Sequence, residues 1–163
     1  MATTKKAVST SAIGLNSEAC GKLADKLNVL LSDYQVFYQN TRGFHWNIKG
    51  EKFFELHIKF EELYNDQQIK IDEIAERILT LGFIPLHSFD DYLKVSEIKP
   101  IKNITDGKKG LQYVLDALKI IIQKERELLS LSEKAEDEGT NSLMGDYVVQ
   151  QEKLVWMYSA YLG

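Results

Sequence analysis

The sequence has one cysteine, two prolines and no long apolar run, and each shortage excludes a class of protein. A single cysteine, Cys20, cannot form an internal disulfide, so the composition fits a reducing compartment, and we expect this thiol to be buried. Scarce proline leaves long stretches free to be helical. No stretch approaches the roughly 18 apolar residues that span a bilayer, and the N-terminus lacks the apolar core of a signal peptide. We therefore expect a cytoplasmic protein with no membrane partner.

Excess positive charge is also missing. The chain has 20 lysines and arginines against 24 acids, and this net charge of −4 gives no general reason to expect binding to nucleic acid. Residues 1–15 are small, polar and aperiodic, and we expect a flexible N-terminal tail. Only Lys5 and Lys6 in this tail could neutralise phosphates. We therefore expect DNA binding to be weak or absent.

Candidate metal ligands are concentrated between residues 44 and 77. His57 and Glu61 lie four residues apart, as do Asp72 and Glu76, in a segment whose apolar residues recur at helical spacing. Each pair therefore lies on one helix face and can approach one ion. The pairs are about 15 residues apart, or roughly 22 Å along the helix, so they cannot share a metal within one chain.

A two-fold axis would bring the two pairs together. Residues 57 and 76 share their midpoint along the helix with residues 61 and 72. If two copies of the helix pack antiparallel about that midpoint, His57 and Glu61 of one chain meet Glu76 and Asp72 of the other. We infer a metal site shared across a symmetric dimer.

The ligand types narrow the choice of metal. Imidazoles and carboxylates without a thiolate suit iron, or another borderline divalent ion such as zinc or manganese. Two carboxylate-rich halves could also hold two irons. The sequence contains no Glu-x-x-His, which is the spacing of di-iron sites built inside one helical bundle. This absence argues against a di-iron site within a single chain.

The same segment and the C-terminus carry a pattern that fixes residue types at many offsets. The pattern consists of His45-Trp46, Phe53-Phe54, Leu56-His57, Phe60-Glu61-Glu62-Leu63-Tyr64, Asp72-Glu73-Ile74-Ala75-Glu76-Arg77 and Trp156-Met157 with Ala160-Tyr161-Leu162. It resembles the Dps family, the miniferritins named as DNA-binding proteins from starved cells. The resemblance covers nearly the whole chain apart from the first dozen residues.

The resemblance implies a specific set of ligands. His45, His57 and the acid at position 61 would come from one subunit, and Asp72 and Glu76 from its two-fold mate. Family members often have Asp where this chain has Glu61. This difference leaves open whether the longer side chain binds the ion directly or through water.

The resemblance also implies a function and an assembly. Members form a hollow homododecamer built from two-fold dimers, which oxidises Fe(II), preferably with hydrogen peroxide, and stores Fe(III) mineral. This ferroxidase activity protects the cell and its DNA from oxidative damage, and zinc is a possible surrogate for iron. Trp46, adjacent to the site, has a hypothetical catalytic role in which it intercepts a stray oxidising equivalent.

We expect residues 16–163 to form one all-α domain, a ferritin-like four-helix bundle with a short extra helix in the long crossover between helices 2 and 3. The expected boundaries are a first helix capped by Asn16 or Ser17, a second from about Lys52 to Leu81 ended by Gly82, a short helix over Ser88–Leu93, a third capped by Asp106, and a fourth that begins at Thr140 or Asn141.

Other interpretations stay open. The protein could be a DNA-compacting nucleoid protein, or a structural helical oligomer that holds zinc at its interface. The acids at 61, 72 and 76 could instead form surface ion pairs with Lys59, Lys70 or Arg77, although such pairs are weak and do not explain the histidines. A last group of acids consists of Glu133, Glu136, Asp137, Glu138 and Asp146. It either lines a three-fold pore, as the resemblance implies, or forms a solvated helix end.

Overall fold

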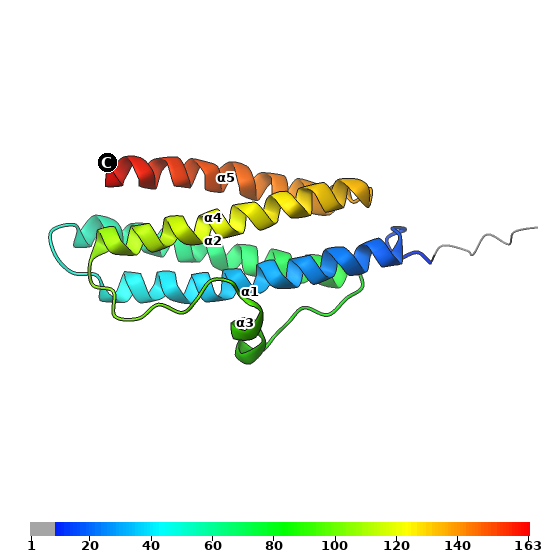
Figure 1. The fold of residues 1–163 in the computed structure, drawn as a ribbon, viewed down its shortest axis with the longest axis horizontal. Helices are drawn as coiled ribbons and strands as arrows, with labels where there is room; N and C mark the ends of the chain where they lie inside the picture. The colour runs from blue at the N-terminus through cyan, green and yellow to red at the C-terminus, as the bar shows by residue number, and fades with distance from the viewer. Residues whose placement is uncertain (1–8) are drawn as a thin grey trace, which may run out of the picture.

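The computed structural model describes residues 9–163, which hold five helices. They are α1 (Ser17–Asn47), α2 (Phe53–Thr80), α3 (Phe89–Val95), α4 (Gly107–Lys134) and α5 (Glu138–Leu162). The four long helices lie side by side as a bundle, and α3 lies beside α1 in the crossover that leads from α2 to α4 (Figure 1). This arrangement confirms the predicted all-α bundle with a short extra helix. Within residues 9–163, no helix combines the length and apolarity needed to cross a membrane.

The helix ends follow the expected capping residues. Asn16 caps α1, and its side-chain oxygen accepts a hydrogen bond of 2.9 Å from the backbone N–H of Ala19. Asp106 does the same for α4 by accepting from Lys109 N–H at 3.0 Å. Gly82 follows α2 with a φ of +92°, a conformation that glycine adopts without steric cost.

The start of α5 differs from our prediction. We expected this helix to begin at Thr140 or Asn141, but it begins at Glu138 because Asp137 is its N-cap. The Asp137 carboxylate accepts from the backbone N–H of Thr140 at 3.0 Å and from the Arg77 guanidinium at 2.5 Å. We predicted that Asp137 and Glu138 belong either to a pore lining or to a solvated helix end. At the start of α5 the helix dipole favours them.

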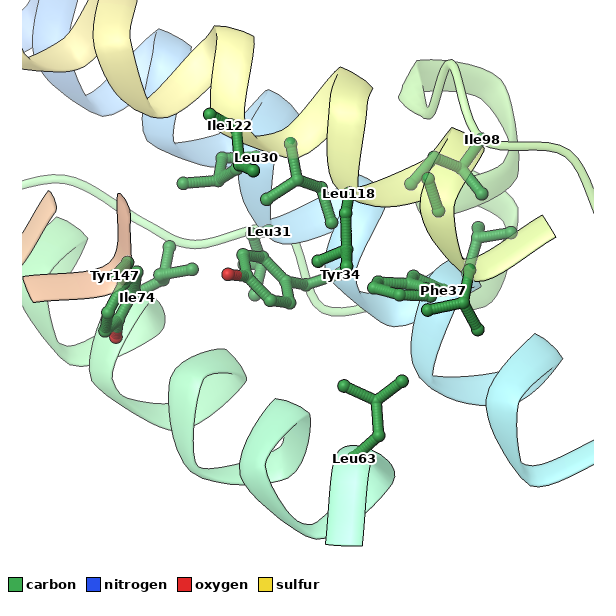
Figure 2. Close-up of a cluster of buried hydrophobic side chains, with 14 of the residues drawn as sticks. Leu30, Leu31, Tyr34, Phe37, Leu63, Ile74, Ile98, Leu118, Ile122 and Tyr147 are labelled. Atoms are coloured by element: carbon green, nitrogen blue, oxygen red, sulfur yellow. The ribbon is translucent and has the colours of Figure 1, made fainter. Parts of the chain in front are cut away.

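The core lies between the four long helices, where apolar side chains from all of them interdigitate (Figure 2). Leu27 and Leu30 of α1, Ile74 of α2 and Ile121 of α4 are completely buried. Each such side chain contributes about 1.5–3 kcal/mol through the removal of apolar surface from water. Cys20 is 1% exposed and belongs to the same core, which confirms that this thiol is a packing residue.

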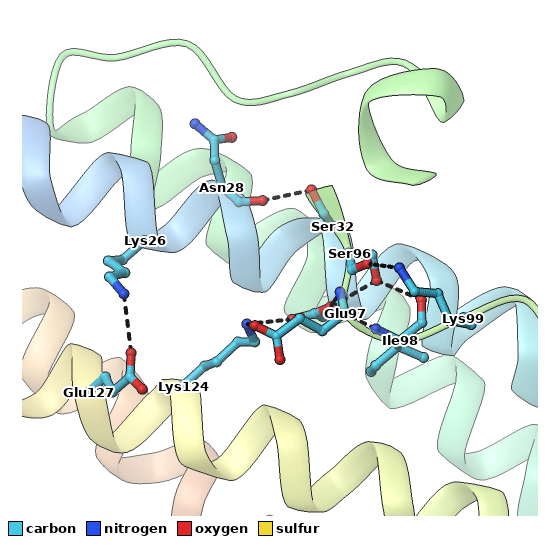
Figure 3. A network of polar contacts seen from close by, with 10 residues as sticks. Lys26, Asn28, Ser32, Ser96, Glu97, Ile98, Lys99, Lys124 and Glu127 are labelled. Atoms are coloured by element: carbon cyan, nitrogen blue, oxygen red, sulfur yellow. Dashed lines mark hydrogen bonds and ion pairs between the residues drawn. The ribbon is translucent and has the colours of Figure 1, made fainter. Parts of the chain in front are cut away.

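Polar contacts fasten the crossover to α1 and α4 (Figure 3). Asp33 of α1 is fully buried, and its Oδ1 accepts 2.8 Å hydrogen bonds from the Ser96 hydroxyl and the Glu97 backbone N–H. Lys124 of α4 lies 3.4 Å from the other Asp33 oxygen and 2.7 Å from the Glu97 carboxylate. The long connection is therefore held along the bundle by a buried carboxylate.

Residues 9–15 precede the bundle and form a hydrogen-bonded turn. The backbone N–H of Ser17 donates to the carbonyl of Ser9 at 2.9 Å, and the N–H of Ser11 donates to the carbonyl of Leu15 at 2.7 Å. We predicted a flexible tail over residues 1–15, and its first eight residues, including Lys5 and Lys6, lie outside the described part of the chain. The domain boundary at residue 16 stays a prediction.

Candidate metal centre

A tight turn between α1 and α2 places two histidines against each other. His45 lies in the last turn of α1, and His57 lies in the second turn of α2. The chain reverses through Gly50, whose φ is +100°, and the backbone N–H of Lys49 donates to Thr105 just before α4. The two imidazole rings stack with their centroids 3.7 Å apart and their planes at 18°.

Reciprocal hydrogen bonds set the orientation of both rings. The Nδ1 of His45 lies 2.7 Å from the backbone carbonyl of His57, and the Nδ1 of His57 lies 2.9 Å from the carbonyl of His45. A carbonyl only accepts, so each Nδ1 carries a proton and donates it. In the neutral form of each ring the lone pair is therefore on Nε2, the nitrogen that could bind a metal.

Two aromatic rings that our sequence reasoning missed pack around the histidines. Phe53 stacks on His57 with centroids 4.9 Å apart, and Tyr64 presents its edge to His45 at 5.3 Å. Both lie on α2, four residues before and seven residues after His57, which is the helical spacing of one face. That spacing was a usable signal in the sequence.

Glu61 completes a group of three ligands within one chain. The ligand atoms of His45, His57 and Glu61 all lie within 4.8 Å of one another. We call this group the half-site. His45 is buried, His57 is half-buried and Glu61 is exposed, so the group opens toward solvent. Two imidazoles and one carboxylate with free positions suit non-haem Fe(II), and the same set also suits zinc.

The comparisons with known proteins identify the family. A model of the ferritin-like domain matches residues 24–163. The DNA protection during starvation protein of Porphyromonas gingivalis is 47% identical over 148 residues, which cover 91% of this chain and 93% of that protein. The chain belongs to the Dps family of ferritin-like proteins.

Solved Dps structures share the whole fold. A Dps protein from Vibrio cholerae O1, described as a member of a broad superfamily of ferritin-like diiron-carboxylate proteins, is 52% identical and superposes with a TM-score of 0.94. That comparison covers 98% of this chain and all of the other. The antigen TpF1 from Treponema pallidum superposes with a TM-score of 0.86 at 27% identity and covers 98% of this chain and 99% of the other.

Asp72 and Glu76 lie further along α2 of this Dps-family chain and do not join the half-site. Both are exposed, and the single group of potential ligands found within residues 9–163 contains neither of them. Their four-residue spacing puts them on one face of the helix. They can contribute to the half-site only across a contact between two chains, which stays a prediction.

The ion-pair alternative does not account for these acids. Lys59 binds Glu62 at 2.6 Å, Lys70 binds Asp66 at 2.6 Å, and Arg77 binds Asp137 at 2.5 Å. Each of the three cations that could have paired with positions 61, 72 and 76 therefore has another partner. Among the cations of residues 9–163, none forms an ion pair with those positions, so the three carboxylates are free to bind an ion.

Trp46 follows the half-site at the end of α1, with 56% of its surface exposed. The guanidinium of Arg42 lies over its ring, 4.6 Å from the centroid, and also lies 5.3 Å from the Tyr38 ring. This contact fixes the indole beside the turn without placing it among the ligands. The catalytic role of Trp46 stays a prediction.

The third histidine of the chain and the acidic group lie elsewhere. His87 is exposed in the crossover, with its Nδ1 3.0 Å from the carbonyl of Pro85, and it belongs to no group of potential ligands found in residues 9–163. Near the turn between α4 and α5, an acidic hollow of about 920 Å³ is lined in part by Glu133, Glu136 and Glu138. The carboxylate of Asp137 lines it too, but it is held by Arg77 and Thr140. A role for these acids in a pore stays a prediction.

Proposed function

We propose that this Dps-family chain is a ferroxidase that binds Fe(II) as substrate at a site completed by a second subunit. The observation that carries the proposal is the half-site, in which one ring nitrogen of each histidine and one carboxylate oxygen of Glu61 lie within 4.8 Å of one another. Metal ligands must be deprotonated, and the two backbone carbonyls already hold the imidazole protons on Nδ1. In the neutral form of each ring, Fe(II) can therefore bind Nε2.

The exposed face of α2 supports the two-fold completion of the site. Phe54 is 81% exposed and Leu79 is 57% exposed, so both present apolar surface to solvent on α2. The midpoint of positions 54 and 79 along α2 is the same as that of positions 57 and 76 and of positions 61 and 72. An antiparallel pairing that brings the ligands together therefore also buries Phe54 of one subunit near Leu79 of the other, as an isologous contact requires.

The ligand set suits oxidation. The imidazole nitrogens admit Fe(II), while carboxylates favour the harder Fe(III) product. Hydrogen peroxide would be the preferred oxidant. Two Fe(II) each give one electron, the O–O bond breaks, two protons are taken up and two water molecules form, so hydroxyl radical is not released. Zinc fits the same two-histidine, one-carboxylate set and would act as an inert surrogate.

We further propose that the subunits form a homododecamer in the cytoplasm and deposit Fe(III) mineral inside it. The names of relatives such as the DNA protection during starvation protein of P. gingivalis motivate the protective role. The exposed acids Glu133, Glu136 and Glu138 would attract cations toward the interior. DNA binding itself would be weak or absent, because the net charge is −4 and residues 1–15 contain only two lysines.

The test is anaerobic loading with Fe(II), followed by hydrogen peroxide or by air in separate samples. Fe(III) absorbance is followed in time, and iron is then located by size-exclusion chromatography. We expect fast oxidation with peroxide and iron that elutes with a particle near twelve subunits. No oxidation above a protein-free control, or iron that elutes apart from protein, would reject the ferroxidase and favour a structural oligomer.

A matched pair of variants assigns the site. His45→Ala/His57→Ala removes both histidine ligands of the half-site. The rate of iron oxidation should fall by more than the roughly 10–100-fold that removal of an outer-shell partner costs. His87→Ala removes the exposed crossover histidine and should oxidise iron at the normal rate. Equal rates for the two variants would show that oxidation occurs elsewhere on the protein.

A further inference from the structure

A second polar group lies in the middle of the bundle, away from the half-site. The Tyr34 hydroxyl of α1 donates a 2.9 Å hydrogen bond to Oε1 of Glu125 on α4. The Nε2 of Gln151 on α5 lies 2.7 Å from the same carboxylate oxygen and 2.5 Å from the tyrosine oxygen. All three side chains are at most 2% exposed. We call Tyr34, Glu125 and Gln151 the core cluster.

Glu125 is placed to act as a base toward the phenol. Burial raises its pKa to about 7, despite the opposing hydrogen bonds from Gln151 and Tyr34 and the nearby charges of Lys70 and Arg126. Its second oxygen, Oε2, has no hydrogen-bond partner within residues 9–163, and neither has Oε1 of Gln151. A proton added to Oε2 of Glu125 would make that oxygen a hydrogen-bond donor.

A second tyrosine links the core cluster to α2. The ring of Tyr147 on α5 meets the ring of Tyr34 edge-on, with centroids 6.4 Å apart and planes at 67° (Figure 2). The Tyr147 hydroxyl donates a 2.5 Å hydrogen bond to Glu73, which follows the predicted ligand Asp72 in the sequence. Aromatic and hydrogen-bond contacts therefore run from Tyr34 through Tyr147 to Glu73 of α2, the residue next in sequence to Asp72.

We propose that Tyr34 is a buried one-electron donor to the iron site, with Tyr147 as the bridge and Glu125 as the acceptor of the phenolic proton. The inference rests on the proposed ferroxidase function. It applies when hydrogen peroxide meets a site that holds only one Fe(II), so that a second electron is missing.

The step balances. One Fe(II) becomes Fe(III), and Tyr34 becomes a neutral phenoxyl radical, so the two together supply two electrons. Hydrogen peroxide takes both electrons and two protons from solvent, its O–O bond breaks, and two water molecules form. The phenolic proton moves across the 2.9 Å hydrogen bond to Glu125, a distance within the reach of a positioned base. Gln151 N–H then stays close to the radical oxygen and stabilises it.

Other aromatic residues lack this combination. Tyr158 is also buried, but it has no hydrogen bond to a carboxylate of residues 9–163. Trp46 and Tyr38 lie under the Arg42 guanidinium, and a neighbouring cation opposes the removal of an electron from a ring. Tyr147 also donates to a carboxylate, but its acceptor Glu73 is exposed, whereas Glu125, the acceptor of Tyr34, is buried.

The experiment uses the assembled protein with one Fe(II) per site, mixed with one equivalent of hydrogen peroxide and freeze-quenched for electron paramagnetic resonance. We expect a tyrosyl radical in the wild-type protein. Tyr34→Phe should lose most of that signal, and Tyr147→Phe should delay its appearance. Glu125→Gln keeps Tyr34 but removes the base, so it should also lower the radical yield. Tyr158→Phe is the matched control and should keep the signal.

The outcomes separate the two proposals. Fe(III) absorbance is recorded on the same samples, and thermal unfolding verifies that each variant is folded. One outcome overturns the tyrosine inference alone: Fe(III) forms, and the radical signal of Tyr34→Phe and Glu125→Gln equals that of the wild-type protein. Absence of Fe(III) from every sample overturns the ferroxidase proposal as well. Supplying two Fe(II) per site should abolish the radical, because the second Fe(II) then gives the second electron.

Discussion

The half-site and the core cluster use their hydrogen-bonding groups in opposite ways. In the half-site each histidine donates one N–H to a backbone carbonyl, and its other nitrogen makes no hydrogen bond to residues 9–163. In the core cluster, Tyr34 and Gln151 both direct their donors at one oxygen of Glu125. The first group lies at the end of the α1–α2 pair and opens to solvent, whereas the second is enclosed by three helices.

This difference decides what each group can exchange with its surroundings. An ion needs free lone pairs and a path from solvent, and the half-site has both. A closed cluster has neither room nor a path for an ion, but a short hydrogen bond allows a proton to move within it. We infer that a ferritin-like bundle can bind ions at the surface where subunits meet and can transfer protons and electrons in its interior.

The largest expected effect comes from separating the two halves of the ion site. Subunits with His45→Ala/His57→Ala and subunits with Asp72→Ala/Glu76→Ala should each fail to oxidise iron. When both are co-expressed, random pairing puts both types in about half of the dimers, and each such dimer regains one of its two sites. We therefore expect about a quarter of the wild-type rate in the iron oxidation assay.

The control for this experiment is co-expression of each defective subunit with itself, which should stay inactive. Native mass spectrometry establishes that mixed oligomers have formed. Mixed oligomers without activity would show that the acids at 72 and 76 do not complete the half-site of a second chain.

How far the sequence predicts the structure depends on how local each signal is. Helix caps such as Asn16 and Asp106 act on residues three positions away, and both were predicted correctly. The start of α5 was missed because an acid between two helices can serve either of them. The hydrogen bond from the Thr140 backbone N–H shows that Asp137 caps the second helix, and the Arg77 guanidinium, 60 residues away in sequence, also contacts its carboxylate.

The same distinction applies to the two polar groups. His57 and Glu61 were recognisable from four-residue spacing on one helix. The Nδ1 contacts to backbone carbonyls depend on the exact path of the turn, which spacing does not reveal. The core cluster was not predicted at all, because Tyr34 and Glu125 are 91 residues apart and come from different helices. The periodicity of a single helix does not predict a contact between side chains of different helices.

The next effect concerns the stability of the core cluster. Because burial raises the pKa of Glu125 from 4.5 to about 7, the folded state binds more protons than the unfolded state between these values. Stability contributed by the protonated group is therefore lost as pH rises from about 4.5 to about 7. Glu125→Gln should remove this loss and make the protein more stable than wild type at pH 8, by about 3 kcal/mol.

Urea unfolding at a series of pH values and fixed protein concentration measures this difference. Glu127→Gln, an exposed change on the same helix, should shift stability little at any pH, because its partner Lys26 forms only a surface pair. A stability difference between Glu125→Gln and wild type that does not grow with pH would contradict the buried-carboxyl interpretation.

A smaller effect should follow from loosening the rings around the half-site. Tyr64→Ala removes the edge contact that holds His45, and we expect iron oxidation to slow by about tenfold, as for loss of an outer-shell partner. Tyr64→Phe keeps the ring and should retain the wild-type rate. If both variants oxidise iron equally fast, the reciprocal carbonyl contacts alone orient the histidines.

The smallest effect separates Trp46 from Tyr34 as the donor of an electron. Removing an electron from the indole would leave positive charge about as far from the Arg42 guanidinium as the present 4.6 Å, a repulsion on the order of 4 kcal/mol near a protein surface. Trp46→Phe should therefore change the radical yield by less than about twofold, and Arg42→Gln should increase the share carried by tryptophan. Freeze-quench spectra of both variants, with Trp156→Phe as an exposed control, measure the two shares. A large loss of radical in Trp46→Phe alone would move the donor from the enclosed core cluster to the solvent-facing end of the bundle.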